Sequence, residues 1–511
     1  MSSEHIQRRD FLKFIGAAGL YFPFSKLTQR LQPAKKSDKP NFLVLVFDTF
    51  TARHISLYGY QRKTTPNIER IAKRSYVYRH HYSASSHTKP SVSSLLTGVY
   101  PWSHRSLTYY TPLMDFFTEN NLFSLMPPEY YKFAFTHNTF VTNILKQFQD
   151  HIDYIKPIEE LALFNPNRFQ NLFQNDERMG FYASKRWRDD YISKSSSLYI
   201  NPLAKAWAGF QADFVQKAHK DEYPLGLSDN LEGYLYKLED AVDWLITDAP
   251  SQPKPFLGYI HVLPPHEYYK PRADFLDMFS DDGVRLTEKP PHFFTEGQTQ
   301  EKLERQSQLY DEYIALVDSE IGRLYDNLDK SGALENTYLL ITSDHGQSFE
   351  RGIHGHGQPV LYETNIHVPL MIHAPNQTEG KDIFTPTSLV DIAPTLLALA
   401  GQPVPLWSEG SLLPELGGEE KTSRLIYAME NTRNYKLKPL THGTFTAIQY
   451  PYKFITYRGY EGFDGIEELY HLENDPEELE NIAPVHADIV QNLKNKLDKT
   501  RAAAEKIYIG E

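Results

Sequence analysis

Four polar residues lie where strands or helices are predicted to begin or end, and their types suit metal-assisted ester chemistry. Asp48 follows the apolar run 41–47, and Asp344 and His345 follow another apolar run far along the chain. The two carboxylates would supply negative charge. The imidazole would add a nitrogen ligand, which suits Zn²⁺ or Mn²⁺ better than Ca²⁺, since Ca²⁺ prefers oxygen ligands alone. A cation that also held the Thr88 hydroxyl would lower its pKa and make its oxygen a nucleophile.

The residues around Thr88 predict the beginning of a helix. Pro90 fits the first helical position, which would place Thr88 just before the helix. Apolar residues then recur at helical spacing as far as Leu96, and Gly98 can end the helix. The free N–H groups and the positive dipole end of such a terminus stabilise an anion. On this stretch alone an ordinary helix cap is the simpler interpretation, so the site hypothesis depends on the distant strand ends.

Further polar side chains lie in predicted loops that would open onto the same sheet edge. His261 and His266 flank a proline-containing turn after the apolar run 256–260. Imidazoles there could hold the ester oxygens, protonate a leaving group or bind a second metal ion. Besides Thr88, the residues expected to act on or bind the substrate are His261, His266, Lys89, His354, His356 and Asn138.

Only a parallel sheet would bring these residues together. Apolar runs at 41–47, 256–260 and 339–342 predict strands buried on both faces, and the amphipathic stretch 306–331 predicts a covering helix. The carboxyl ends of such strands share one edge. We predict an α/β fold with a doubly wound, mostly parallel sheet and helices on both faces. A smaller C-terminal antiparallel sheet subdomain with a terminal helix should follow.

The predicted boundaries follow changes in composition along the chain. They are a signal and linker at 1–39, a catalytic α/β domain at 40–400 with an insertion at about 150–250, and a C-terminal subdomain at 401–511. The periodicity also predicts helices over 228–247 and 387–400.

Composition excludes several classes of function. The chain has no cysteine, which excludes disulfides, thiolate nucleophiles and cysteine-ligated metals. Its net charge of −12, without a broad basic patch, argues against nucleic-acid binding. No stretch is long and apolar enough to predict a transmembrane helix.

The N-terminal segment differs from the rest of the chain. Arg8 and Arg9 precede the sequence Phe-Leu-Lys and the short apolar run 14–24. This pattern resembles a twin-arginine export signal, with an ordinary basic amphipathic N-terminus as the alternative. We therefore expect a periplasmic or extracellular protein that engages the twin-arginine translocation machinery.

A series of short motifs runs in one order along nearly the whole chain, from about 41 to 506. They are Phe47-Asp48-Thr49, Tyr58-Gly59-Tyr60, Thr65-Pro66-Asn67, Thr88-Lys89-Pro90-Ser91, Leu95-Leu96-Thr97-Gly98, His261 through Tyr269, Thr342-Ser343-Asp344-His345-Gly346, Val368-Pro369-Leu370 and Asn474-Asp475-Pro476. Each motif is weak alone, but their joint order resembles the sulfatase family of the alkaline phosphatase superfamily. The resemblance implies the two-part fold predicted above, with Asp48, Asp344 and His345 at metal-ligand positions and Thr88 at the nucleophile position.

The sequence departs from this family at the nucleophile. Sulfatases place Cys or Ser there, later oxidised to formylglycine, with an Arg four residues on; here Thr88 and Val92 stand at these positions. Because threonine carries a methyl on Cβ, the same oxidation cannot give that aldehyde. Unmodified Thr nucleophiles are typical of superfamily relatives such as nucleotide phosphodiesterases and phosphoglycerol or phosphoethanolamine transferases. Lys89 could supply the charge lost with the Arg or could face solvent. Thr49 stands where sulfatases often have a further Asp ligand, which argues against tight Ca²⁺ binding.

We therefore expect an exported hydrolase that depends on a divalent metal (Mn, Zn, Ca or Mg). It would cleave an anionic phosphate or phosphonate ester, or transfer the group, through Thr88. One alternative is a sulfuric ester hydrolase that works without formylglycine, and another is a non-catalytic binding protein with the same fold.

Overall fold

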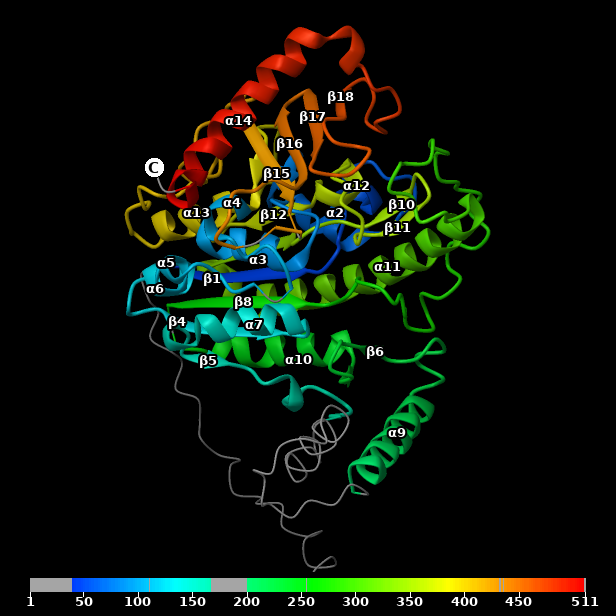
Figure 1. The fold of residues 1–511 in the computed structure, drawn as a ribbon. Coiled ribbons are helices and arrows are strands. Elements are labelled where there is room, and N and C mark those ends of the chain that lie inside the picture. The colour runs from blue at the N-terminus through cyan, green and yellow to red at the C-terminus, as the bar shows by residue number, and fades with distance from the viewer. Residues whose placement is uncertain are drawn as a thin grey trace, which may run out of the picture. The chain divides into compact units, whose positions relative to one another are not determined.

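The computed structural model describes residues 39–166 and 200–509, except for 110, 254, 432 and 435. The predicted export signal therefore lies outside the described residues. An eight-stranded sheet forms the centre of the described chain (Figure 1). Its strands, in spatial order, are β13 (Lys381–Ile383), β2 (Tyr76–Tyr78), β12 (Leu370–His373), β9 (Thr337–Ser343), β1 (Asn41–Phe47), β8 (Phe256–Val262), β4 (Tyr131–Thr136) and β5 (Tyr154–Ile155).

The sheet is mostly parallel, as predicted. Strand β1 lies between β8 and β9 and is parallel to both, whereas β12 is antiparallel to its neighbours β9 and β2. Val46 of β1 pairs with His261 on one side and with Thr342 on the other. Because the three central strands end in register, the residues that follow them emerge at one edge of the sheet.

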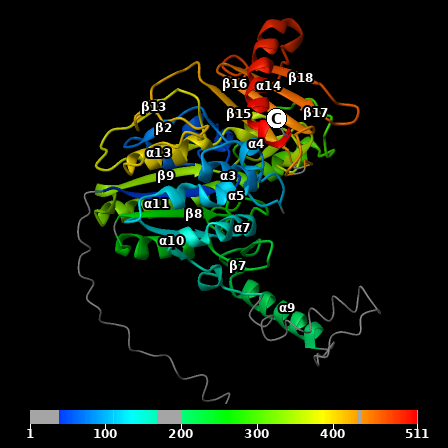
Figure 2. The same ribbon diagram turned by 60° about the vertical axis from the view of Figure 1, so that its left-hand side comes forward.

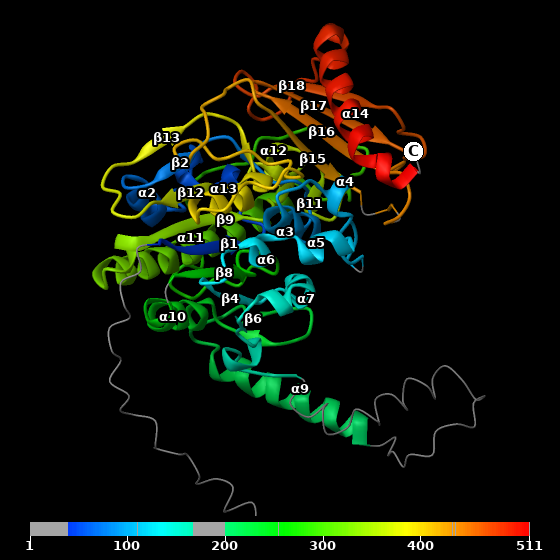
Figure 3. The same ribbon diagram turned by 90° about the vertical axis from the view of Figure 1, so that its left-hand side faces the viewer.

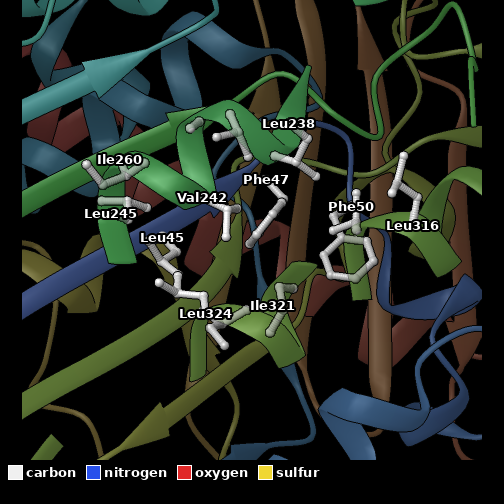
Figure 4. Close-up of a cluster of buried hydrophobic side chains, with 14 of the residues drawn as sticks. Leu45, Phe47, Phe50, Leu238, Val242, Leu245, Ile260, Leu316, Ile321 and Leu324 are labelled. Atoms are coloured by element: carbon white, nitrogen blue, oxygen red, sulfur yellow. The ribbon is translucent and has the colours of Figure 1, made fainter. Parts of the chain in front are cut away.

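Helices cover both faces of the sheet. The helices on one face are α2 (Pro66–Ala72), α10 (Leu238–Asp248) and α11 (Gln300–Lys330); those on the other are α3 (Thr88–Thr97), α6 (Leu122–Leu125), α7 (Thr139–Gln147) and α13 (Ile392–Leu399). Figure 4 shows Leu45 and Phe47 of β1 packed against Val242 of α10 and Leu324 of α11. The alternating side chains of β1 thus enter two separate apolar layers, which is why its sequence is apolar throughout.

A smaller antiparallel sheet follows, as predicted. Its strands, in order, are β15 (Leu425–Glu430), β16 (Gly443–Gln449), β17 (Tyr452–Arg458) and β18 (Glu467–His471). The terminal helix α14 (Ala487–Ile509) lies along this sheet (Figures 2 and 3) and packs Leu493 and Leu497 against it. The other α-helices and strands of the described residues are β3 (His81–Tyr82), α4 (Pro101–His104), α5 (Asp115–Glu119), α9 (Ile200–Ala218), β6 (Ser228–Asp229), β7 (Leu235–Tyr236), β10 (Ser348–Glu350), β11 (Ile353–Gly355), α12 (Glu363–Ile366) and β14 (Thr387–Ser388).

Two predicted helices are shorter than their periodicity indicated. The stretch 228–247 opens with the β6–β7 hairpin, in which Gly233 has φ +84°, and the helix α10 begins only at Leu238. The stretch 387–400 opens with strand β14 and a 3₁₀ turn, and α13 begins at Ile392. In both cases a turn with its own hydrogen bonds replaces the first helical turns. Among the described residues, no helix has both the length and the apolar character that a bilayer crossing requires.

Candidate active site

Asp48, Asp344 and His345 form a fully buried group at the carboxyl ends of β1 and β9. One ligand atom from each lies within 4.8 Å of the other two. His345 Nε2 is 3.7 Å from Asp48 Oδ1 and 3.6 Å from Asp344 Oδ2. The parallel register of the two strands brings these residues together although nearly three hundred positions separate them in sequence.

The electrostatics of this group favour a cation. Burial, and then the neighbouring Asp344, raise the pKa of Asp48 well above its ordinary value. Burial acts in the same direction on Asp344, but His345 and His261 outweigh it and lower its pKa to about 2. Burial lowers the pKa of His345 to about 4, so its imidazole is neutral at pH 7. Ionising both buried acids is unfavourable because the two negative charges repel each other. A divalent cation between them would offset this repulsion.

The hydrogen bonds of the group leave ligand atoms free. Asp48 Oδ1 is buried and has no hydrogen-bond partner among the described residues. His345 Nδ1 donates to the Gly346 carbonyl at 3.0 Å, so the lone pair of Nε2 points away from the backbone. A metal-ligating histidine is characteristically held by its other nitrogen in this way. The residues therefore fit a divalent cation.

Hydrogen bonds connect the backbone segments that follow β1 and β9, next to the two acids. The hydroxyl of Ser343 donates to the Phe47 carbonyl at 2.6 Å and accepts from the Phe50 N–H at 2.8 Å. Thr49 adopts a left-handed conformation, with φ +61°, and its N–H donates to Asp344 Oδ1. These bonds fix the two strand ends, and with them the carboxylates.

Thr88 lies beside this group, at the first residue of α3. Its Oγ1 is 3.2 Å from His345 Nε2. The interpretation of Thr88 as a helix cap is wrong, because His87 is the N-cap residue and no side chain caps this helix. The Thr88 hydroxyl therefore makes no capping hydrogen bond to the helix backbone. It contacts His345, next to the buried acids.

A cavity of about 410 Å³ opens above Thr88. Its polar lining residues include Thr88, His87, Asn138, His266 and His356, and its aromatic lining includes Tyr109 and Phe140, whose rings stack at 4.6 Å. The other lining residues are Thr139, Asp229, Asn230, Leu231, Leu263, Glu267 and Tyr268. The cavity therefore offers both polar groups for an ester and aromatic surface for its alcohol part.

Asn138 joins the cavity to the buried acids. It is the N-cap of α7, and its Oδ1 accepts from the Phe140 N–H at 2.7 Å. Its Nδ2 donates to Asp48 Oδ2 at 2.6 Å. Since Asn138 both lines the cavity and holds Asp48, it has a positioning function besides the predicted contact with substrate.

The structure places three of the predicted substrate-contacting residues outside the cavity lining. His261 is fully buried behind Asp344, with Nε2 3.4 Å from Asp344 Oδ2. Lys89 does not face solvent, because it is only 3% exposed and its ammonium donates to the Tyr109 carbonyl at 3.0 Å; burial lowers its pKa to about 8. His354 Nε2 is hydrogen-bonded to the Tyr269 hydroxyl at 3.1 Å. Each of these side chains instead contacts another residue of the same chain.

Other residues that line the cavity were not predicted from the sequence. Glu267 follows His266 directly, so the carboxylate could have been noticed beside the imidazole. His87 precedes Thr88 and lines the same cavity. Tyr109 and Phe140 carry no sequence signal, because their stacking depends on how the loop containing Tyr109 approaches the first turn of α7.

Comparisons with known proteins agree with this architecture. Residues 40–402 match the family model described as Sulfatase, and residues 352–503 match the model of the N-sulphoglucosamine sulphohydrolase C-terminal region. The choline-sulfatase of Rhizobium meliloti is 26% identical over 470 residues, which cover 87% of this chain and 82% of that protein. Human arylsulfatase K is 25% identical over 358 residues, which cover 63% of this chain and 66% of that protein.

Solved structures share the fold at low identity. The phosphonate monoester hydrolase SpPMH from Silicibacter pomeroyi superposes with a TM-score of 0.64 at 19% identity, covering 91% of this chain and 96% of that one. A 2-O GAG sulfatase gives a TM-score of 0.62 at 20% identity, covering 93% and 94%. The α/β domain and the C-terminal sheet thus occur together in these structures.

Proposed function

Because this chain belongs to the sulfatase family, and is thus a hydrolase that acts on ester bonds, we propose that it cleaves a phosphate or phosphonate ester with Thr88 as the nucleophile. One observation carries the proposal. Thr88 lines the cavity, and its hydroxyl lies 3.2 Å from His345 Nε2, beside a group of two acids and an imidazole. A hydroxyl on a residue of the cavity wall, in contact with a hydrogen-bond acceptor, suits a nucleophile for a bound ester.

The identity of residue 88 supports a phosphorus ester over a sulfate ester. A threonine oxygen can attack phosphorus directly and form a phosphothreonine, and it needs no prior oxidation of the side chain. Val92 stands on α3 where the resemblance to sulfatases would place an arginine. We therefore assign the nucleophilic role to the unmodified Thr88 side chain.

Asp48, Asp344, His345 and the Thr88 hydroxyl are the residues that would hold a divalent metal ion. When bound, such an ion lowers the pKa of a hydroxyl and offsets the negative charge of the ester. The chain's own groups prepare the site for it. Asn138 holds Asp48, His261 holds Asp344, and the Gly346 carbonyl fixes the His345 tautomer.

The reaction would then proceed in two displacements. In the first, the Thr88 hydroxyl loses its proton to solvent water as Oγ1 bonds to phosphorus; the bond from phosphorus to the alcohol oxygen breaks, and that oxygen takes a proton from water. In the second, a water oxygen bonds to phosphorus and gives up a proton to solvent, while the bond from phosphorus to Thr88 Oγ1 breaks and Oγ1 takes a proton from water. The amino-terminal end of α3 lies at Thr88, where its positive dipole end stabilises the charged group through both steps.

A direct assay tests this proposal. We expect turnover of aryl phosphate monoesters, phosphodiesters or phosphonate monoesters in the presence of Mn²⁺, Zn²⁺, Ca²⁺ or Mg²⁺, and no turnover of aryl sulfates under the same conditions. When the reaction is rapidly quenched, the mass of the peptide containing Thr88 should be higher by one phosphoryl group. Turnover of sulfate esters alone would overturn the proposed preference.

The sequence similarity supports sulfuric ester hydrolysis as a second candidate. The choline-sulfatase relative matches 87% of this chain, so the overall likeness extends well beyond the metal group. In that case Thr88 would form a sulfothreonine without formylglycine. The same assay and the same mass measurement separate the two candidates.

Export is a further part of the proposal. The arginine pair at Arg8 and Arg9 and the apolar run after it support passage through the twin-arginine machinery to the periplasm or beyond. Replacing both arginines with lysine should leave the precursor in the cytoplasm. Unchanged secretion of the Arg8→Lys, Arg9→Lys double variant would overturn this assignment.

A further inference from the structure

A second group of metal-ligating side chains lies in the wall of the same cavity. His266 and Glu267 follow β8, and His356 follows β11. One ligand atom from each lies within 4.8 Å of the other two. The centre of the His356 ring is 4.6 Å from that of His345, so this second group adjoins the first.

The hydrogen bonds of the two histidines fix their tautomers. His266 Nδ1 donates to the Glu267 carbonyl at 2.6 Å, since a carbonyl oxygen can only accept. His356 Nδ1 donates to Gln347 Oε1 at 2.9 Å. In each neutral imidazole the proton is therefore on Nδ1, and Nε2 presents a lone pair. This is the arrangement that metal-ligating histidines adopt.

Gln347 orients two members of the group at once. It is fully buried; its Oε1 accepts from His356, while its Nε2 donates to Glu267 Oε2 and to the Tyr269 hydroxyl. The amide thus holds the Glu267 carboxylate next to the His356 ring. A buried residue that aligns an imidazole and a carboxylate in this way has the function of an outer-shell partner in metal sites.

We propose that His266, Glu267 and His356 bind a second divalent cation of the zinc class. Two imidazole nitrogens and one carboxylate oxygen match the ligands of three-residue zinc sites, which leave a fourth position open, here toward the cavity. In the neutral form of each ring, Nε2 accepts and does not donate, so such a ring would hold a cation directly. Adjacent cations clamp the oxygens of phosphate esters, so the role of this ion rests on the proposed function and deepens it.

Metal stoichiometry tests the proposal independently of activity. The full-length protein, stripped with a chelator and dialysed against ZnCl₂, should contain two zinc ions per chain by elemental mass spectrometry. The Glu267→Gln and His356→Asn variants should retain one ion each. His354→Asn is the matched control, because His354 lies on the same hairpin and its ring contacts the Tyr269 hydroxyl but is not one of the three proposed ligands; this variant should retain two ions.

The outcomes distinguish this site from the first. The Asp344→Asn variant should also retain one ion, and zinc-edge anomalous scattering from the wild-type protein should show two peaks. One ion in the wild type, absent from Asp344→Asn and present in Glu267→Gln, would overturn the second site and leave the proposed function intact. Two bound ions without turnover of any ester would instead overturn the proposed function.

Discussion

Thr88 Oγ1 lies 3.2 Å from His345 Nε2, although 257 residues separate the two side chains along the chain. The contact exists because α3 begins beside the edge at which β9 ends. His345 cannot turn away, because its Nδ1 is bonded to the Gly346 carbonyl. The position of the proposed nucleophile is therefore set by the sheet edge and by one backbone hydrogen bond.

Loss of the Thr88 hydroxyl should abolish ester hydrolysis. We expect Thr88→Ala to lower kcat/KM by at least about 10³-fold, the order seen when a nucleophile is removed. Thr88→Ser keeps the hydroxyl and should remain active. Thr97→Ala is a matched control at the other end of α3, where the Thr97 hydroxyl bonds only the Ser93 carbonyl. Equal activity of Thr88→Ala and Thr97→Ala would exclude Thr88 as the nucleophile.

Metal removal should lower both activity and thermal stability. A cation bound by the folded state alone stabilises it by about 2.7 kcal/mol at a concentration 100 times its Kd. In the stripped protein, Asp48→Asn should raise Tm or leave it unchanged, because one of two adjacent buried carboxylates is removed. Scanning calorimetry with and without added metal measures both effects. A metal-induced rise in Tm for Asp48→Asn as large as that of the wild type would contradict the assignment.

Asn138 should affect the site through Asp48. Asn138→Asp keeps an oxygen to cap α7 but loses the Nδ2 donor and places a second carboxylate against Asp48. We expect kcat to fall about 10- to 100-fold, the order found for outer-shell partners of metal ligands. Asn143→Ala, on the exposed surface of the same helix, is the control. Steady-state kinetics with metal titration would measure the fall in kcat. A change in Tm without a change in kcat would show that Asn138 contributes to stability alone.

Asp318 should make the stability of the fold depend on pH. Burial raises its pKa to about 6, although Oδ1 accepts from the Ile68 N–H and Oδ2 from the Asn67 N–H at the start of α2. Between about pH 4 and pH 6 the folded state then binds more protons than the unfolded state, so this group lowers the free energy of unfolding as the pH rises. Denaturant unfolding across this range measures the slope.

The Asp318→Asn variant should show a flatter pH dependence between pH 4 and pH 6 than the wild type. Its overall stability should also be lower, because an amide cannot accept on both sides. Asp326→Asn, on the exposed side of the same helix, provides the comparison. Identical slopes in the wild type and Asp318→Asn would show that Asp318 does not titrate in this range.

The sequence by itself determined the three central strands, β1, β8 and β9, and the residues that follow them. Local apolar runs specify strands such as β1 and β9, and a parallel sheet brings the ends of such strands to one edge. These rules predict that Asp48, Asp344 and His345 lie close together, whereas the contact of Thr88 with His345 depends on where α3 begins beside that edge.

Only the tertiary structure decided which neighbouring side chains face the cavity. Lys89 turns to the Tyr109 carbonyl, and His261 packs behind Asp344. Gln347 aligns His356 with Glu267. These outcomes depend on loop paths and on buried hydrogen bonds between residues far apart in sequence, which no local periodicity encodes.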